Sequence, residues 1–144
     1  MTSFLYVNYL AIVIATATAW LFGAAYYGVL GKAWLAALGT TAEEIRQDAA
    51  GKSRIAQAGP FILSFVAEFV MAYVLYGLLL HLAGWTVRAG VISAALCWAG
   101  FVLTTVMVNN AFPGRKPMLT VIDAGHWLGV LLIMGAILGW IGPR

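Results

Sequence analysis

The sequence predicts an all-α integral membrane protein, folded as a four-helix bundle with four transmembrane helices and short loops. Hydrophobic residues make up 63% of its 144 residues and charged residues only 9%, whereas soluble domains have about 45–50% and 25%. A soluble fold of this size cannot bury so much apolar surface, which excludes a cytosolic enzyme and a nucleic-acid-binding domain. Four apolar runs are long enough to cross a bilayer, which takes roughly 20 residues, and they lack the alternation of barrel strands. We expect residues 1–144 to form a single transmembrane domain that contacts the lipid bilayer.

The first predicted span covers about Leu5–Leu30, within a stretch that has no charged side chain. A cleaved signal peptide is the alternative, but a basic n-region is missing and the apolar run is too long. Three more spans are expected at about 61–82, 90–108 and 119–141. The connector 32–60 is the longest link. Thr40 and Thr41, each followed three residues later by a glutamate, predict a capped short helix inside it.

The distribution of Lys and Arg predicts the orientation. Six of the eight basic residues fall on one side of the bundle: Lys32, Arg46, Lys52, Arg54, Arg115 and Lys116. Arg88 and Arg144 fall on the other side. The positive-inside rule therefore places the connector 32–60 and the loop 109–118 in the cytoplasm, and both termini in the periplasm of a cell with an inner membrane. Aromatic side chains near the span ends are expected to form an interfacial belt: Tyr6, Tyr9, Trp34, Trp85 and Trp140.

Small residues predict where the helices approach one another closely, because spans in lipid associate through packing rather than through the hydrophobic effect. The first span has one every fourth position, and the third and fourth spans have similar faces. These residues are Ala11, Ala15, Ala19 and Gly23; Ser93, Cys97 and Gly100; and Gly125, Gly129, Gly135 and Gly139.

Polar residues inside the apolar runs are the candidate functional residues. Glu68 lies eight residues beyond Pro60, which is about 12 Å along a helix, so its carboxyl must be paired or protonated. It belongs to a semi-polar stripe at fourfold spacing: Ser64, Glu68, Ala72 and Tyr76. His126 lies at a similar depth on the fourth span. We expect a buried polar cluster in the inner half of the bundle: Glu68, Asp123, His126, Asn109 and Tyr26.

Two hypotheses explain this cluster. We favour a buried hydrogen-bond network that fixes the register of the helices; the alternative is a proton relay, an ion pathway or a small polar ligand site. A metal site is a third hypothesis, because Asp123 and His126 have the spacing of di-iron ligands, but such sites use several more carboxylates. His81 and His126 lie toward opposite ends, so they cannot ligate one haem. We expect no cofactor and no metal, and without a nucleophile motif we expect no enzyme.

Three segments are distinctive: Ala24–Trp34, Asn109–Pro117 and Ile122–His126. They resemble a bacterial family of four-span membrane proteins known as domain of unknown function 1761. Family members end the first span on Trp-Tyr-Gly-Pro, where this chain has Tyr26 for the tryptophan and Val29 for the proline. The resemblance implies the four-span bundle and carries no activity.

From these observations we expect an integral membrane protein of unknown activity, with a structural or accessory role as a homo-oligomer or beside a membrane protein partner. The alternative is a proton- or ion-coupled transporter of a small solute that acts as an oligomer. A polar cavity open to one membrane face would favour transport. A dry, fully bonded network would favour the structural role.

Overall fold

The computed structural model describes residues 7–143, and within this range the chain is helical and contains no strand. Leu5, Tyr6 and Arg144, which enter the predicted first span, the aromatic belt and the charge count, lie outside the described residues.

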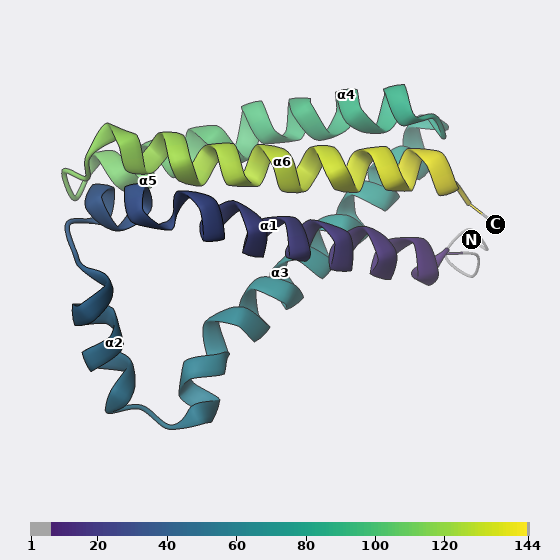
Figure 1. Cartoon of the computed structure of the whole chain (residues 1–144). Helices are drawn as coiled ribbons and strands as arrows, with labels where there is room; N and C mark the ends of the chain where they lie inside the picture. Colours follow the sequence, from purple (N-terminus) through teal and green to yellow (C-terminus); the bar gives the residue numbers. More distant parts are fainter. Residues whose placement is uncertain (1–6, 144) are drawn as a thin grey trace.

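The predicted fold class is confirmed. Four helical stretches are long and apolar enough to cross a membrane: α1 (Tyr9–Leu38), α3 (Arg54–Leu82), the stretch Val87–Ala111, and α6 (Pro117–Ile141). The start of α1 and the end of α6 lie at one end of the described structure, and the link between α1 and α3 lies at the other end (Figure 1). Five of the basic residues that the orientation argument used therefore lie toward one end: Arg46, Lys52, Arg54, Arg115 and Lys116.

Two helix ends differ from the prediction, and the connector 32–60 is consequently shorter than expected. Helix α1 continues past Leu30 to Leu38, and α3 begins at Arg54, with Pro60 inside the helix. Hydropathy detects only the apolar run, whereas the backbone hydrogen bonds of a helix do not require apolar side chains. Each helix can therefore extend beyond its apolar run. Gly39 then ends α1 in the left-handed region, at φ 82°, where glycine carries no Cβ penalty.

The short helix predicted in the connector is confirmed as α2 (Ala42–Ala50). The Thr41 hydroxyl accepts from the Glu44 N–H at 3.2 Å, and the Glu44 carboxylate accepts from the Thr41 N–H at 3.0 Å, which is a capping box. The Thr40 hydroxyl also donates to Glu44, and these hydrogen bonds lower the pKa of the Glu44 carboxyl below its usual value.

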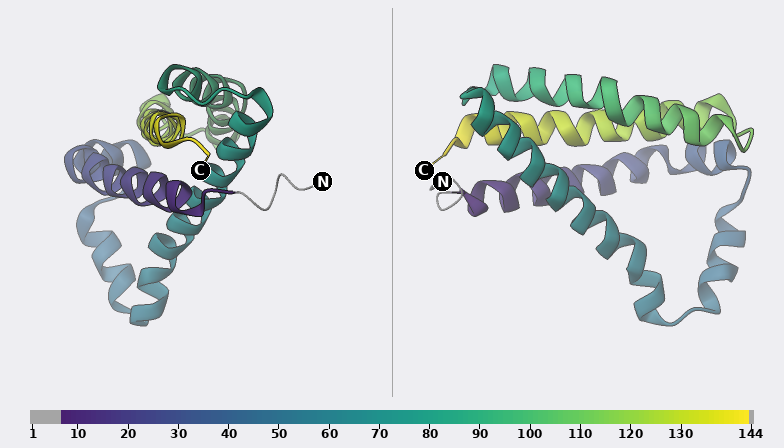
Figure 2. Two further views of the ribbon diagram at one scale, coloured as in Figure 1. Left: turned by 90° about the vertical axis from the view of Figure 1, so that its right-hand side faces the viewer. Right: turned by 180° about the vertical axis from the view of Figure 1, so that it is seen from behind.

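Helix α6 is the centre of the packing, with α1 on one side and the stretch Val87–Ala111 on the other (Figures 1 and 2). The close-approach face predicted on α1 is confirmed, because all four of its members are buried: Ala11, Ala15, Ala19 and Gly23. On the other side of α6, Gly135 packs directly on Gly90. A Cβ built on Gly90 would lie 2.7 Å from the carbonyl carbon of Gly135. Gly100, by contrast, is exposed.

The third span is interrupted by a π-helical segment. Helix α4 (Val87–Cys97) continues into η2 (Trp98–Leu103) and then into α5 (Thr104–Ala111). The Trp98 indole N–H donates to the Ala124 carbonyl of α6 at 2.8 Å. No sequence pattern predicted this segment, in which each backbone hydrogen bond spans one residue more than in an α-helix.

Helix α3 crosses the other spans and diverges from α1 and α6 toward its own N-terminus (Figure 2). Its C-terminal half is buried at Ala72, Leu75, Tyr76 and Leu79, whereas large apolar side chains such as Phe61 and Leu63 in its N-terminal half are exposed. The divergence leaves the space in which the candidate site lies.

Candidate functional site

A partly open cavity of about 760 Å³ lies among α1, α2, α3 and α6, on the side where α3 diverges. Polar and aromatic side chains from three helices line it: Trp20, Tyr27 and Trp34 of α1, Ser64 and Glu68 of α3, and His126 of α6. Two predicted members of the polar cluster, Glu68 and His126, therefore face the same cavity.

Glu68 lies on the inward face of α3, with 2% of its surface exposed. Its carboxyl oxygen Oε2 is buried and has no hydrogen-bond partner. One turn earlier, the Ser64 hydroxyl accepts from the Trp20 indole N–H at 3.0 Å. The stripe predicted from fourfold spacing is thus the inward face of the helix. An unpartnered buried carboxyl oxygen costs free energy, so it calls for an explanation.

His126 is 6% exposed, and its Nδ1 atom is buried without a partner. Four rings surround the imidazole, with centroids 4.9–6.4 Å away: Phe22, Tyr26, Tyr27 and Trp127. A Cβ built on Gly23 would lie 2.7 Å from Nε2. Glycine at this position therefore makes room for the imidazole against α1.

Asp123, by contrast, is hydrogen-bonded to α1 through one carboxylate oxygen. Its Oδ1 atom accepts from the Tyr27 hydroxyl at 3.0 Å and from the Trp34 indole N–H at 3.1 Å. The Trp34 indole N–H therefore points toward α6. Tyr26 supports the same contact, since its hydroxyl donates to the Ile122 carbonyl at 2.9 Å.

Two expectations about the cluster are not met. Asn109 is exposed and lies outside the cluster, while its neighbour Asn110 faces α6 and donates to the Thr120 hydroxyl at 3.1 Å. Adjacent residues point about 100° apart on a helix, so only one of the two asparagines can face α6. Within residues 7–143, no hydrogen bond or ion pair joins Glu68 to His126. The cluster therefore separates into a bonded part at Asp123 and an unbonded part in the cavity.

The aromatic members of the cavity lining were missed in the sequence. Trp20, Tyr27 and Trp34 recur every seven residues along α1, with Ala24 and Gly31 between them on the same face. This spacing places all of them on one side of a helix. A tryptophan and tyrosine stripe beside small residues was the signal available for finding them.

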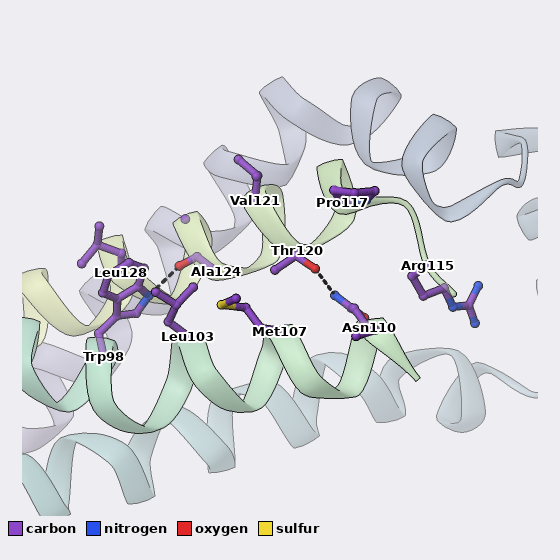
Figure 3. A pocket seen from close by; sticks show the side chains of 12 residues that line it. Trp98, Leu103, Met107, Asn110, Arg115, Pro117, Thr120, Val121, Ala124 and Leu128 are labelled. Atoms are coloured by element: carbon purple, nitrogen blue, oxygen red, sulfur yellow. Dashed lines mark hydrogen bonds between the residues drawn. The ribbon is translucent and has the colours of Figure 1, made fainter. Parts of the chain in front are cut away.

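A second cavity, of about 610 Å³, lies between α6 and the π-helical and α5 part of the third span. Figure 3 shows that its two polar contacts join the helices, from Trp98 to Ala124 and from Asn110 to Thr120. Most of the remaining lining is apolar, and Arg115 lies at one end (Figure 3).

Among residues 7–143, no three His, Cys, Asp or Glu side chains gather closely enough to hold a metal ion. His81 is exposed near the other end of α3, where its Nδ1 lies 2.7 Å from the Gly77 carbonyl oxygen. It does not line the cavity that His126 faces.

The fold and the site together define a class: a multi-span helical membrane protein with a partly open internal cavity that a buried carboxyl group lines. The chain belongs to the family described as Protein of unknown function (DUF1761), whose model matches residues 10–139. The family resemblance predicted from the three distinctive segments is confirmed. No curated protein and no solved structure matches the chain.

Proposed function

We propose that this protein is the subunit of a proton-coupled transporter for a small solute, that it acts as an oligomer, and that the Glu68 cavity is its binding site. One observation carries the proposal: a carboxyl group that is almost fully buried has an oxygen without a partner, in a cavity that is partly open. A carboxyl with a purely structural role would be expected to have its hydrogen bonds satisfied inside the protein.

The coupling follows from the cost of a bare charge in a low-dielectric site. With the cavity empty, Glu68 avoids this cost by carrying a proton. A solute that supplies a partner for the carboxylate allows the proton to leave, so the solute and the proton compete for one group. The titratable side chains around the cavity are Tyr27 of α1 and Asp123 and His126 of α6. Of these, Tyr27 and Asp123 are already bonded to each other.

The proposed orientation keeps the connector and the loop between α5 and α6 in the cytoplasm of a cell with an inner membrane. It is supported by the grouping of the basic side chains toward the end of the molecule where α2 lies, as the positive-inside rule requires of cytoplasmic loops. In this orientation the cavity lies in the cytoplasmic half of the protein, since α2 contributes to its lining.

A structural or accessory role is the second candidate, and a different set of contacts favours it. Asn8 donates its side-chain amide to the Gly142 carbonyl at 3.2 Å and its backbone N–H to the Tyr76 hydroxyl at 3.1 Å. These bonds and those of Asp123 tie α1 to α3 and α6. A protein whose function is to hold a fixed shape needs contacts of this kind.

Modification by a hydrophobic carbodiimide separates the two candidates. The reagent adds to a protonated carboxyl group that it can reach from the membrane and leaves an N-acylurea of known mass. We expect Glu68 to be modified in native membranes, more at low pH than at high pH, as read by mass spectrometry of the tryptic peptide. Glu68→Gln should lose the adduct, whereas Glu43→Gln, on the exposed α2, should keep it. An unmodified Glu68 across the pH range would refute the transporter proposal and favour the structural role.

A further inference from the structure

We propose that the solute is a hydrophobic monovalent organic cation, such as an alkylated or aryl-substituted onium or amine, bound between the Glu68 carboxylate and the aromatic side chains of α1. This inference rests on the proposed function, because it uses the same cavity. It adds the chemical class of the ligand.

The charge of the lining supports a cation. Glu68 is the acidic side chain that lines the cavity, and no Lys or Arg of the described chain lines it. The nearby Asp123 already accepts two hydrogen bonds on one oxygen. Among the lining side chains, the Glu68 carboxylate would therefore be the negative charge offered to an occupant, and a buried charge is stable only when it is paired. An anionic solute would instead add a second negative charge to the cavity.

The aromatic lining supports an organic cation over a metal ion. The polar atoms of Trp20, Tyr27 and Trp34 are already engaged, the first with Ser64 and the other two with Asp123. What these side chains still offer is ring surface, which attracts organic cations through the quadrupole of the π system. A hard metal ion would need six or more oxygen ligands, and the lining is mostly apolar.

Binding of the cation must release a proton. If Glu68 carries a proton in the empty protein, the exchange is carboxylic acid plus cation giving carboxylate–cation pair plus a free proton. The stoichiometry is one proton released for each cation bound. His126 is the other titratable group with an unpartnered atom in this cavity, so Glu68 is the source of the proton only if Glu68→Gln abolishes the release at saturating cation.

Direct binding of two ions of matched shape tests the inference. Tetraphenylphosphonium and tetraphenylborate differ mainly in the sign of their charge. We expect the purified full-length protein, in an uncharged detergent, to bind the phosphonium saturably with release of one proton. The borate should show only the non-saturable partition seen with detergent alone. Glu68→Gln should weaken phosphonium binding about tenfold or more, whereas Glu43→Gln should bind like the native protein.

A matched pair of glycine variants tests the place of binding without touching the carboxyl. Gly31 lines the cavity and Gly28 does not, and a Cβ on either meets no atom within 4 Å. Gly31→Phe should therefore fill the cavity and abolish phosphonium binding, and Gly28→Phe should leave it unchanged. If Glu68→Gln fails to fold, protection of native Glu68 from carbodiimide by the phosphonium provides the same information.

The possible outcomes separate this inference from the proposed function. Saturable phosphonium binding that needs Glu68 and an open cavity supports both. Equal binding of the two ions, or saturable binding of neither, overturns the cation inference. In that case, carbodiimide modification of Glu68 would still support a proton-coupled site for a solute of another class. An unmodified Glu68 would refute both.

Discussion

Gly90→Ala has the sharpest expected effect on stability, because it places a methyl group where the backbones of α4 and α6 touch. The added carbon would lie 2.7 Å from the carbonyl carbon of Gly135 and would overlap the carbonyl oxygen as well. The obstruction is backbone, so no side-chain rotation relieves it. The two helices must move apart, and they lose dispersion contacts along their interface.

The expected change in the free energy of unfolding follows from two opposing effects. Overpacking a tight contact costs about 1–3 kcal/mol, and small residues are what allow membrane helices to approach this closely. Replacing glycine by alanine inside a helix stabilises the folded protein by about 0.5–1 kcal/mol. We expect Gly90→Ala to lower the free energy of unfolding by a net amount of about 1–2 kcal/mol, since backbone atoms cannot yield and the overpacking term lies in its upper range.

Gly28→Ala is the matched control. No atom lies within 4 Å of its added Cβ, so this variant gains only the higher helix propensity of alanine. Its free energy of unfolding should stay the same or rise. Unfolding by a denaturing detergent, in a fixed host micelle, measures the difference between the two variants. Adding Gly135→Ala to Gly90→Ala should cost less than the sum of the single changes, because the first has already separated the helices. Equal stability of Gly90→Ala and Gly28→Ala would refute the close contact.

Further predictions address orientation, the bonded aspartate and the packing of α6. With the native cysteine replaced by alanine, an impermeant thiol reagent should label a cysteine at Arg88 in intact cells but not one at Lys52; the reverse pattern would invert the topology. Asp123→Ala orphans two donors and should cost about 1–3 kcal/mol in detergent unfolding, more than Asp123→Asn; equal losses would mean that both donors find other partners. Gly129→Leu should lower the melting temperature more than Leu132→Ala, because a side chain at 129 meets a phenylalanine ring of α1; equally small changes would place this face of α6 in lipid.

The number and type of the spans could be predicted from the sequence because bilayer thickness fixes the length of an apolar helix. Their ends could not. Helix α1 continues past Lys32, and α3 begins before Pro60. A charged side chain does not interrupt backbone hydrogen bonding, and α3 continues through Pro60 although this residue has no N–H to donate. The capping box at Thr41 was predictable, because both of its bonds are local.

For the candidate site, the depth of each residue along its helix could be predicted, but its hydrogen-bond partners could not. Depth along the helix predicted that Glu68 and His126 would lie at a similar level, and both line one cavity. It could not distinguish Glu68 from Asp123, because the donors that satisfy Asp123 are Tyr27 and Trp34, which lie about 90 residues earlier in the chain. Whether a buried carboxyl is bonded or free depends on helix rotation, which hydropathy does not report.

The π-helical segment Trp98–Leu103 bears on how relatives should be aligned. A π turn is what an α-helix forms when it accepts one residue beyond its normal count. A family member with an uninterrupted α-helix here is therefore expected to be one residue shorter within the span, and an alignment that moves this gap into a loop would pair the wrong faces. Removing one residue, such as Ala99, would turn the following segment by about 100°. That rotation would carry Asn110 away from Thr120, so the inserted residue sets which asparagine meets α6.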